Sequence, residues 1–323
     1  MHRRSLIAGA LIALSVPANA QSRDKVPRVG VLRWDAISSA ARLDPFREAL
    51  RHNGLIEGQN VAVEWRFADG QTDRAREIAE EFVRAGVDVI VAFSTPAAHA
   101  AKNATQSIPI IISTADPLGS GLVSGLAHPG GNVTGVSLMM PDLASKRVEL
   151  LTELLPGLAH LGFLGSTRDS AAKSFVRHTA DAAERKGIQL HAELVPGPED
   201  FEEAFQKFAR AQVKAVVVQP LFTIDPPVAA RVVGVANVRR IPVISDYASF
   251  AREGALMAYG PRQEDTLRIA ARYLKQVLNG VSPGDLPVTQ PTNFVLALNL
   301  KVASVLGVQV PPAIVLRADE VIE

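Results

Sequence analysis

The chain contains the apolar run VDVIVAF (Val87–Phe93), which passes directly into the sequence STPAAHAA (Ser94–Ala101). A nearly continuous run of branched apolar residues is typical of a parallel strand that helices cover on both faces. Ser or Thr before a proline often starts a helix, because the hydroxyl caps a free N–H group and proline fits the first turn. This stretch therefore predicts a strand that turns directly into a helix, the repeating unit of a doubly wound α/β sheet.

Similar units lie on both sides of this stretch and form a first series. Its strands are expected at residues 28–33, 61–67, 87–93, 109–113 and 133–138, and its helices at 43–53, 72–85, 96–106 and 142–155. The assignments rest on β-branched runs for the strands and on apolar residues at helical spacing for the helices. The helices have the length of right-handed crossovers between parallel strands.

A second series begins after residue 160. Its strands are expected at residues 161–165, 189–195, 215–219 and 242–245, and its helices at 170–186, 200–211 and 228–238. Two such series predict an α/β protein with two doubly wound, Rossmann-like lobes. After residue 250 the regular alternation of strands and helices ends: strands are expected at 255–260 and 294–298 and a helix at 264–279. We expect this part of the chain to pass back and forth between the lobes.

The first twenty residues have the parts of a secretory signal peptide. Arg3 and Arg4 form a basic segment, Leu6–Val16 is apolar, and Pro17–Ala20 ends in an A-x-A cleavage site. The apolar segment is shorter than the roughly 20 residues that span a bilayer. We expect cleavage of residues 1–20 and export. A buried N-terminal helix is the alternative, and the two arginines leave both Sec and twin-arginine export open.

Composition excludes several classes of partner and site. The 323 residues include no cysteine, so disulfides, thiolate metal sites and a lipid anchor on an N-terminal cysteine are excluded. Loss of residues 1–20 would change the formal net charge from +1 to −1, whereas a nucleic-acid-binding surface needs an excess of Lys and Arg. No later apolar run approaches membrane-spanning length, so we expect no membrane insertion.

Ligands of open α/β sheets bind at the carboxyl ends of the strands, in the loops that lead into helices. The candidate ligand contacts at these positions are Trp34, Asp35, Ser94, Thr95, Pro96, Thr114, Asp116, Ser166, Thr167, Gln219, Leu221, Asp246 and Tyr247. The hydroxyls and helix start at Ser94–Thr95 suit an anion such as a carboxylate, and Asp116 suits an amine or hydroxyl. Structural roles stay open: a helix cap at Ser94, an Asx-turn at Asp116, and solvated loops elsewhere.

The sequence lacks the motifs of common catalytic and cofactor sites. Seven histidines are scattered without an H-E-x-x-H motif or a pair at metal-binding spacing, and there is no G-x-S-x-G motif. The glycine-rich stretch Gly119–Gly125 misses the last glycine of a dinucleotide-binding motif and the Lys-Ser/Thr of a phosphate-binding loop. We therefore expect a non-catalytic protein without a metal or a cofactor.

Several segments, in the same order along the chain, resemble one bacterial family. They are FREAL (46–50), GLIEGQN (54–60), VDVIV (87–91), TPAA (95–98), DPLGSGLV (116–123), LAHPGGNVTG (126–135), KRVELL (146–151), YGP (259–261), LPVTQPT (286–292), NLK (299–301) and LRADEVIE (316–323). They cover essentially the whole chain after the signal peptide. The chain thus resembles the ABC-transporter substrate-binding proteins that include tryptophan- and tyrosine-binding members, a family with the type I periplasmic-binding fold.

The resemblance implies two lobes that are joined by three crossing strands and hold a ligand in the cleft between them. We expect residues 26–140 plus about 261–285 in the first lobe, and residues 141–258 plus about 286–323 in the second. In amino-acid-binding relatives of this fold, hydroxyl and N–H groups of the first lobe take the ligand carboxylate. An acid of the second lobe takes the amine, and Asp246 is the candidate here.

One departure from the family affects the expected ligand. Many members have arginine and glutamate where this chain has Ala248 and Ser249. If this loop contacts the ligand, the specificity of better-known members does not transfer to this chain.

The resemblance also implies a function. We expect a periplasmic protein, not lipidated and monomeric, that captures a small molecule and delivers it to an ABC permease and its ATPase. An amino acid or another small carboxylate is the favoured ligand. Two alternatives stay open: a sensing module that feeds a signalling receptor and, less favoured, an α/β enzyme.

Overall fold

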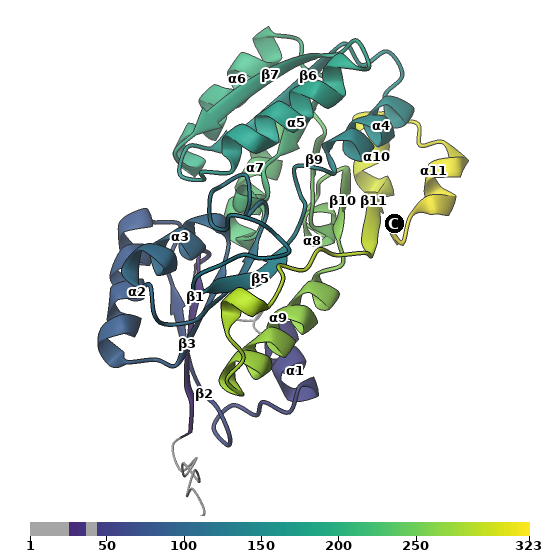
Figure 1. Cartoon of the computed structure of the whole chain (residues 1–323). Coiled ribbons are helices and arrows are strands. Elements are labelled where there is room, and N and C mark those ends of the chain that lie inside the picture. Colours follow the sequence, from purple (N-terminus) through teal and green to yellow (C-terminus); the bar gives the residue numbers. More distant parts are fainter. Residues whose placement is uncertain (1–25, 37–43) are drawn as a thin grey trace, which may run out of the picture.

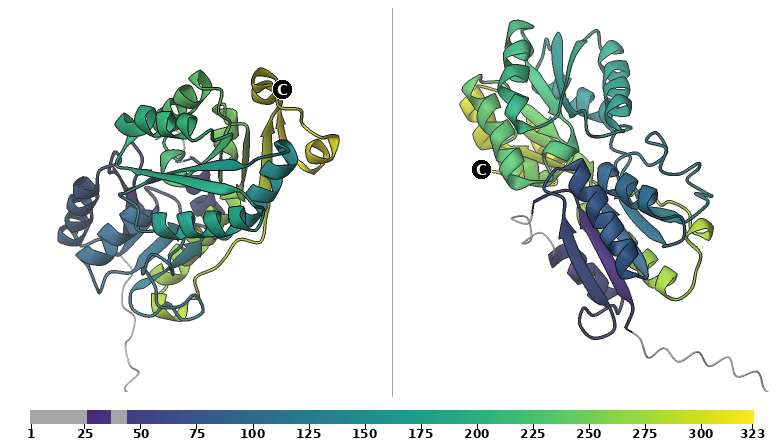
Figure 2. Two further views of the ribbon diagram at one scale, coloured as in Figure 1. Left: turned by 90° about the horizontal axis from the view of Figure 1, so that it is seen from above. Right: turned by 90° about the vertical axis from the view of Figure 1, so that its left-hand side faces the viewer.

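The computed structural model describes residues 26–36 and 44–323, which fold into two α/β lobes lying one above the other (Figures 1 and 2). The signal peptide predicted at residues 1–20 lies outside the described residues. Among the residues that are described, no helix combines the length and the apolar character needed to cross a membrane.

The first lobe is built on a sheet of five parallel strands in the order β2-β1-β3-β4-β5. Its strands are β1 (Arg28–Arg33), β2 (Ala62–Phe67), β3 (Val89–Phe93), β4 (Ile110–Thr114) and β5 (Val133–Ser137). Its helices are α1 (Asp44–His52), α2 (Thr72–Ala85), α3 (Thr95–Ala104) and α9 (Gln263–Leu278). Helices α2 and α3 pack together, and α1 packs with α9, so the central strands are buried between two helical layers.

The second lobe has a seven-stranded sheet in the order β12-β11-β10-β9-β8-β6-β7, in which β11 runs antiparallel to β10. Its strands are β6 (His160–Ser166), β7 (Gln189–Val195), β8 (Ala215–Val218), β9 (Val243–Ser245), β10 (Met257–Pro261), β11 (Phe294–Asn299) and β12 (Glu320–Ile322). Its helices are α4 (Ala144–Leu154), α5 (Ala172–Glu184), α6 (Phe201–Arg210), α7 (Pro226–Val238), α8 (Ala248–Arg252), α10 (Leu300–Leu306) and α11 (Pro312–Arg317). Short 3-10 helices occupy Pro198–Asp200, Pro220–Phe222 and Pro283–Asp285.

The structure confirms the two predicted series of strands and helices. Strands β1 and β7 and helix α2 have the predicted bounds, and most other ends differ by one or two residues. Helices α8 and α11 and strand β12 were not predicted from the sequence. Strand β12 is only three residues long, and it is a strand because it pairs with β11, which a local sequence pattern does not reveal.

The chain passes between the lobes three times, after β5, after β10 and before β11. Helix α9 follows a strand of the second sheet but packs against β3, β4 and β5 of the first (Figure 1). The segment after α9 also contacts β5, because Thr134 Oγ1 donates to the Leu286 carbonyl at 2.8 Å and Thr289 pairs with Val136. The division of the chain into lobes stays a prediction, and these contacts place residues 286–289 beside the first sheet.

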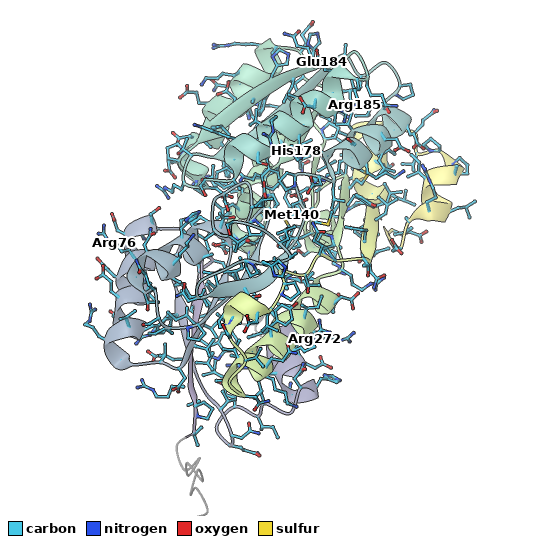
Figure 3. The ribbon with its side chains drawn as sticks, in the orientation of Figure 1. Arg76, Met140, His178, Glu184, Arg185 and Arg272 are labelled. Carbon is cyan, nitrogen blue, oxygen red and sulfur yellow. The ribbon has the colours of Figure 1, made fainter. Side chains whose placement is uncertain are left out.

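A buried ion pair lies beneath the first crossing. Arg147 of α4 and Asp246, which follows β9, have side chains that are 1% and 0% exposed, and Arg147 Nη2 lies 2.5 Å from Asp246 Oδ1. The same nitrogen donates to the carbonyl of Met140, which is labelled between the two lobes in Figure 3. Burial raises the pKa of Asp246 to about 7, against the opposing effect of Arg147. The pair therefore ties α4 to the crossing and to the loop after β9.

We expect Arg147→Met to lower the free energy of unfolding by about 3–5 kcal/mol, because it leaves the Asp246 carboxylate buried without a cation. Urea denaturation followed by circular dichroism at pH 7.5 measures this loss. The double variant Arg147→Met/Asp246→Leu removes both charges and is expected to recover most of the stability. A double variant as unstable as the single one would contradict this account.

Candidate functional site

A cavity lies between the lobes and is lined by residues of both. It lies at the carboxyl ends of strands from both sheets, where ligands of open α/β sheets bind. Its lining residues are Arg33, Asp35, Phe93, Ser94, Thr95, Ser113, Thr114, Ala115, Leu138, Met140, Asp169, Phe175, Pro220, Leu221, Ile224, Tyr247, Ser249, Gln263, Thr266 and Leu267.

The turn from β3 into α3 forms one wall of this cavity. Ser94 has a φ of 97°, a backbone conformation that costs a non-glycine residue energy and that clusters at functional sites. Its N–H donates to the Ser113 carbonyl at 3.1 Å, and its Oγ accepts from the Ala97 N–H at 3.4 Å. Ser94 is therefore the N-cap of α3, one of the two roles that the sequence left open, and it also lines the cavity. The positive end of the helix dipole points to the same place.

Two buried threonine hydroxyls face the cavity beside this turn. Thr95 is 2% exposed and Thr114 is fully buried, and neither Oγ1 has a hydrogen-bond partner within the described part of the chain. A buried polar group without a partner costs about 1–3 kcal/mol. With the N-terminus of α3, these hydroxyls form a site of hydrogen-bond donors that suits an anion such as a carboxylate.

An acid of the second lobe lies opposite these hydroxyls. Asp169, between β6 and α5, is 6% exposed, and its two oxygens accept from the Ala171 N–H at 2.9 Å and from Gln219 Nε2 at 2.7 Å. Gln219 Oε1 in turn accepts from the Ser166 N–H at 2.7 Å, so the carboxylate has a fixed orientation. Burial raises the pKa of Asp169 to about 6, and the hydrogen bond from the Ala171 N–H and the nearby Thr95 hydroxyl partly oppose this effect. The group is therefore mostly ionised at neutral pH.

The remaining walls of the cavity combine apolar side chains with a few polar ones. Aromatic rings of Phe93, Phe175 and Tyr247 line it together with Leu138 and Met140 of the first crossing. Such a site can enclose an apolar or aromatic body while polar groups at one end fix its orientation. Within residues 26–36 and 44–323, no group of three or more His, Cys, Asp or Glu side chains is placed to hold a metal ion.

The lobes are closed on each other around the cavity. Hydrogen bonds between the lobes join Ser174 Oγ to Asp116 Oδ2 at 2.6 Å, Ser170 Oγ and His99 Nε2 at 3.0 Å, and Arg168 Nη1 to the Gly70 carbonyl at 3.0 Å. These contacts come from the loop after β6 and from the first turns of α5. Because such bonds break when the lobes separate, they contribute to the energy of the closed form.

Six of the residues predicted as ligand contacts line the cavity: Asp35, Ser94, Thr95, Thr114, Leu221 and Tyr247. They lie at or just after the carboxyl ends of five strands, β1, β3, β4, β8 and β9, from both lobes. The rule that ligands bind at the carboxyl ends of strands therefore identified residues that the fold brings together.

The other predicted residues do not line this cavity. Asp116 bonds to Ser174 and to the Gly119 N–H, and Asp246 pairs with Arg147, so neither acid faces the cavity. Trp34 and Ser166 line a neighbouring cavity, and Gln219 orients Asp169. Pro96 is buried in α3, and Thr167 is exposed.

Several lining residues were not predicted. Arg33, Phe93 and Ser113 lie at or next to the last residue of a strand, so the strand-end rule could have found them. Asp169 lies three residues beyond the predicted Ser166, in the loop that follows β6. Other lining residues come from α9 and from the first crossing, whose positions depend on tertiary packing.

The sequence model of one family, described as ABC transporter substrate binding protein, matches residues 34–322. This chain therefore belongs to the ABC transporter substrate-binding protein family. The family is one of binding proteins, which agrees with a cavity between two lobes.

Named relatives of this substrate-binding protein bind aromatic amino acids. The "Tyrosine-binding protein" of Clostridioides difficile is 30% identical over 266 residues, which cover 82% of this chain and 76% of that protein. A solved ABC domain in complex with L-Trp from Streptococcus pneumonia is 27% identical, covers 92% of this chain and 100% of that one, and has a TM-score of 0.84.

Two further structures bear on conformation and fold. A ligand-free, open substrate binding protein with adhesive properties from Clostridium difficile is 26% identical, covers 92% of this chain and 99% of that one, and has a TM-score of 0.65. This substrate-binding protein thus superposes better on the L-Trp complex than on the open form, as expected for closed lobes. A leucine binding protein from Thermotoga maritima, 12% identical over 78% of this chain and 81% of that one with a TM-score of 0.59, shares the fold, a periplasmic binding protein fold of type I.

We expect Thr114→Val to leave the free energy of unfolding of this substrate-binding protein unchanged or to raise it by up to about 1 kcal/mol, because the hydroxyl has no protein partner to lose. Thr134→Val is the matched control: Thr134 is also fully buried, but its Oγ1 donates to the Leu286 carbonyl at 2.8 Å. It should lose about 1–3 kcal/mol. Urea denaturation of both variants is the measurement, and an equal loss in both would contradict a ligand-directed role for the Thr114 hydroxyl.

Proposed function

We propose that this protein is the periplasmic solute-binding component of an ABC import system and that its ligand is an amino acid. The ligand enters the cleft between the lobes, and closure of the lobes around it creates the form that the permease accepts. The family and the amino-acid-binding relatives support this proposal. Capture of the ligand is the whole task of the protein, and the ATPase of the importer supplies the energy for transport.

The observation that carries the proposal is the pairing of an anion site with a buried acid. The α-carboxylate of an amino acid would accept from the hydroxyls of Thr95 and Thr114 at the N-terminus of α3. The ammonium group would donate to Asp169. These groups lie on opposite lobes, so a ligand that contacts both stabilises the closed form over the open one.

The apolar walls favour a large side chain on this amino acid. Phe93 from the first lobe and Phe175 and Tyr247 from the second supply aromatic surface against which a ring can stack. Ser249, in a loop where many family members carry glutamate, also lines the cavity. The departure at this loop therefore bears directly on which side chain this protein accepts.

The rest of the proposal concerns location and partners. The signal peptide at residues 1–20 directs export, and the chain after cleavage lacks the cysteine that a lipid anchor requires. The protein would therefore diffuse freely in the periplasm as a monomer and meet a permease with its ATPase at the inner membrane.

The first test is a thermal-shift screen of residues 21–323 against the twenty L-amino acids, followed by calorimetry on each hit. A ligand at a hundred times its Kd should add about 2.7 kcal/mol to the free energy of unfolding. The decarboxylated amine and the N-acetyl derivative of a hit serve as controls, and both should bind far more weakly. If none of the amino acids stabilised the protein, the proposed ligand class would be wrong.

The second test uses the pKa of Asp169. Above a pH of about 6 its carboxylate is ionised and attracts an ammonium group, and below this pH it takes up a proton. Affinity for the amino acid should therefore fall about tenfold from pH 7.5 to pH 5, because only a small fraction of the acid stays ionised. Asp169→Asn should bind weakly at every pH, whereas the surface control Asp181→Asn should behave as the wild type. Retention of tight binding in Asp169→Asn would assign the ammonium to another group.

A further inference from the structure

Three residues of the first sheet form a row across the floor of the cavity. Arg33 on β1 pairs with Phe93 on β3, and Phe93 pairs with Ser113 on β4. Paired residues of neighbouring strands point to the same face, and the strands lie about 4.8 Å apart, so the backbones of Arg33 and Ser113 are about 10 Å apart. All three residues line the cavity. The row therefore runs from a charged side chain across a ring to a hydroxyl.

The hydroxyl end of this row is the end proposed for the amino-acid head group. Thr114 follows Ser113 directly, and Thr95 follows Phe93 by two residues, next to Asp169 of the second lobe. A ligand whose carboxylate and ammonium bind at this end has its side chain over Phe93, and the tip of a long side chain then points toward Arg33.

The Arg33 end of the row is a buried charge pair. Arg33 Nε and Nη2 donate to the two oxygens of Asp35 at 2.8 and 2.6 Å, and the two side chains are 12% and 1% exposed. The guanidinium carbon lies 5.3 Å from the centroid of the Phe93 ring, so the charge lies beside the aromatic floor. Asp35 thus neutralises and orients Arg33 without taking all its hydrogen-bonding capacity.

Arg33 keeps donors available for a ligand. The pair with Asp35 uses two of its five N–H groups, and among the described residues the guanidinium makes no other hydrogen bond. A guanidinium cannot accept a hydrogen bond. The ligand group that fits the remaining N–H groups is therefore an oxygen that accepts a hydrogen bond. If this oxygen also carries a hydrogen, it can donate to the carboxylate of Asp35, which lies next to Arg33.

We propose that Arg33 and Asp35 are specificity-determining residues that select a side chain ending in an oxygen, and that L-tyrosine is preferred over L-phenylalanine and L-tryptophan. This inference rests on the proposed function. A phenol accepts from Arg33 and donates to Asp35. Phenylalanine leaves the remaining N–H groups of Arg33 without an acceptor, and the indole N–H of tryptophan can donate to Asp35 but cannot accept from Arg33. Sites built to bond a hydroxyl reject the analogue that lacks it because their buried polar groups stay unpaired.

The test is calorimetry of residues 21–323 with L-tyrosine, L-phenylalanine and L-tryptophan. The wild type should bind L-tyrosine at least about tenfold more tightly than either of the other two. Arg33→Met should abolish this preference through loss of affinity for tyrosine. Wild-type protein that binds phenylalanine as tightly as tyrosine would overturn the inference.

Two further variants separate specificity from folding. Arg33→Met leaves Asp35 buried without its cation, so the double variant Arg33→Met/Asp35→Leu is measured beside it, with melting curves for both. The double variant should bind phenylalanine at least as tightly as tyrosine, and one that kept the tyrosine preference would contradict the proposal. Arg66→Met is the matched control, since Arg66 on the edge strand β2 of the same sheet is exposed and pairs with Glu64 at 2.6 Å. It should keep the wild-type order of affinities.

The same panel distinguishes this inference from the proposed function. Failure of every L-amino acid to bind would remove the proposed ligand class and the inference with it. Tight binding of an amino acid with an order of affinities that is the same in the wild type and in Arg33→Met would overturn only the role of Arg33 and Asp35.

Discussion

Parallel strands of one sheet all end at the same edge, and in this protein two such edges face each other. The ends of β1, β3 and β4 bring a charge pair, a ring and several hydroxyls to one side of the cavity. The ends of β6, β8 and β9 bring an acid and apolar loops to the other. Residues far apart in the sequence thereby surround one small volume. The helices keep these edges clear because they cover the faces of the sheets rather than their ends.

The fold follows from local patterns to a large extent, and its limits are physical. Buried strands such as β3 and amphipathic helices such as α2 carry their signal in their own residues. Strand β12 does not, because it exists only through its pairing with β11. The position of α9 in the first lobe depends on how its apolar face packs against β3, β4 and β5, which the order of the elements does not reveal.

Only part of the candidate site could be predicted from local sequence patterns. Ser94, Thr95 and Thr114 were predicted because a strand end and a helix start are local features. Asp246 and Asp169 both follow strands of the second lobe, and the sequence gives no reason to prefer one as a ligand contact. The difference comes from Arg147, which lies on a distant helix and neutralises Asp246 in the core. Asp169 instead receives only neutral hydrogen bonds and stays at the cavity with its charge available.

Several features that cost stability gather around this cavity, among them the strained Ser94 and the two threonine hydroxyls without partners.

The second and third crossings between the lobes have a mechanical consequence. They continue β10 and β11, which are hydrogen-bonded antiparallel neighbours, and the bonding extends one residue further, because the Arg262 N–H donates to the Asn293 carbonyl at 3.0 Å. Two strands joined in this way flex as a single ribbon, out of its plane far more easily than within it. We expect the two lobes to open and close mainly by bending of this ribbon. If the protein interconverts between an open and a closed form in this way, the fraction that is closed before a solute binds scales the apparent affinity.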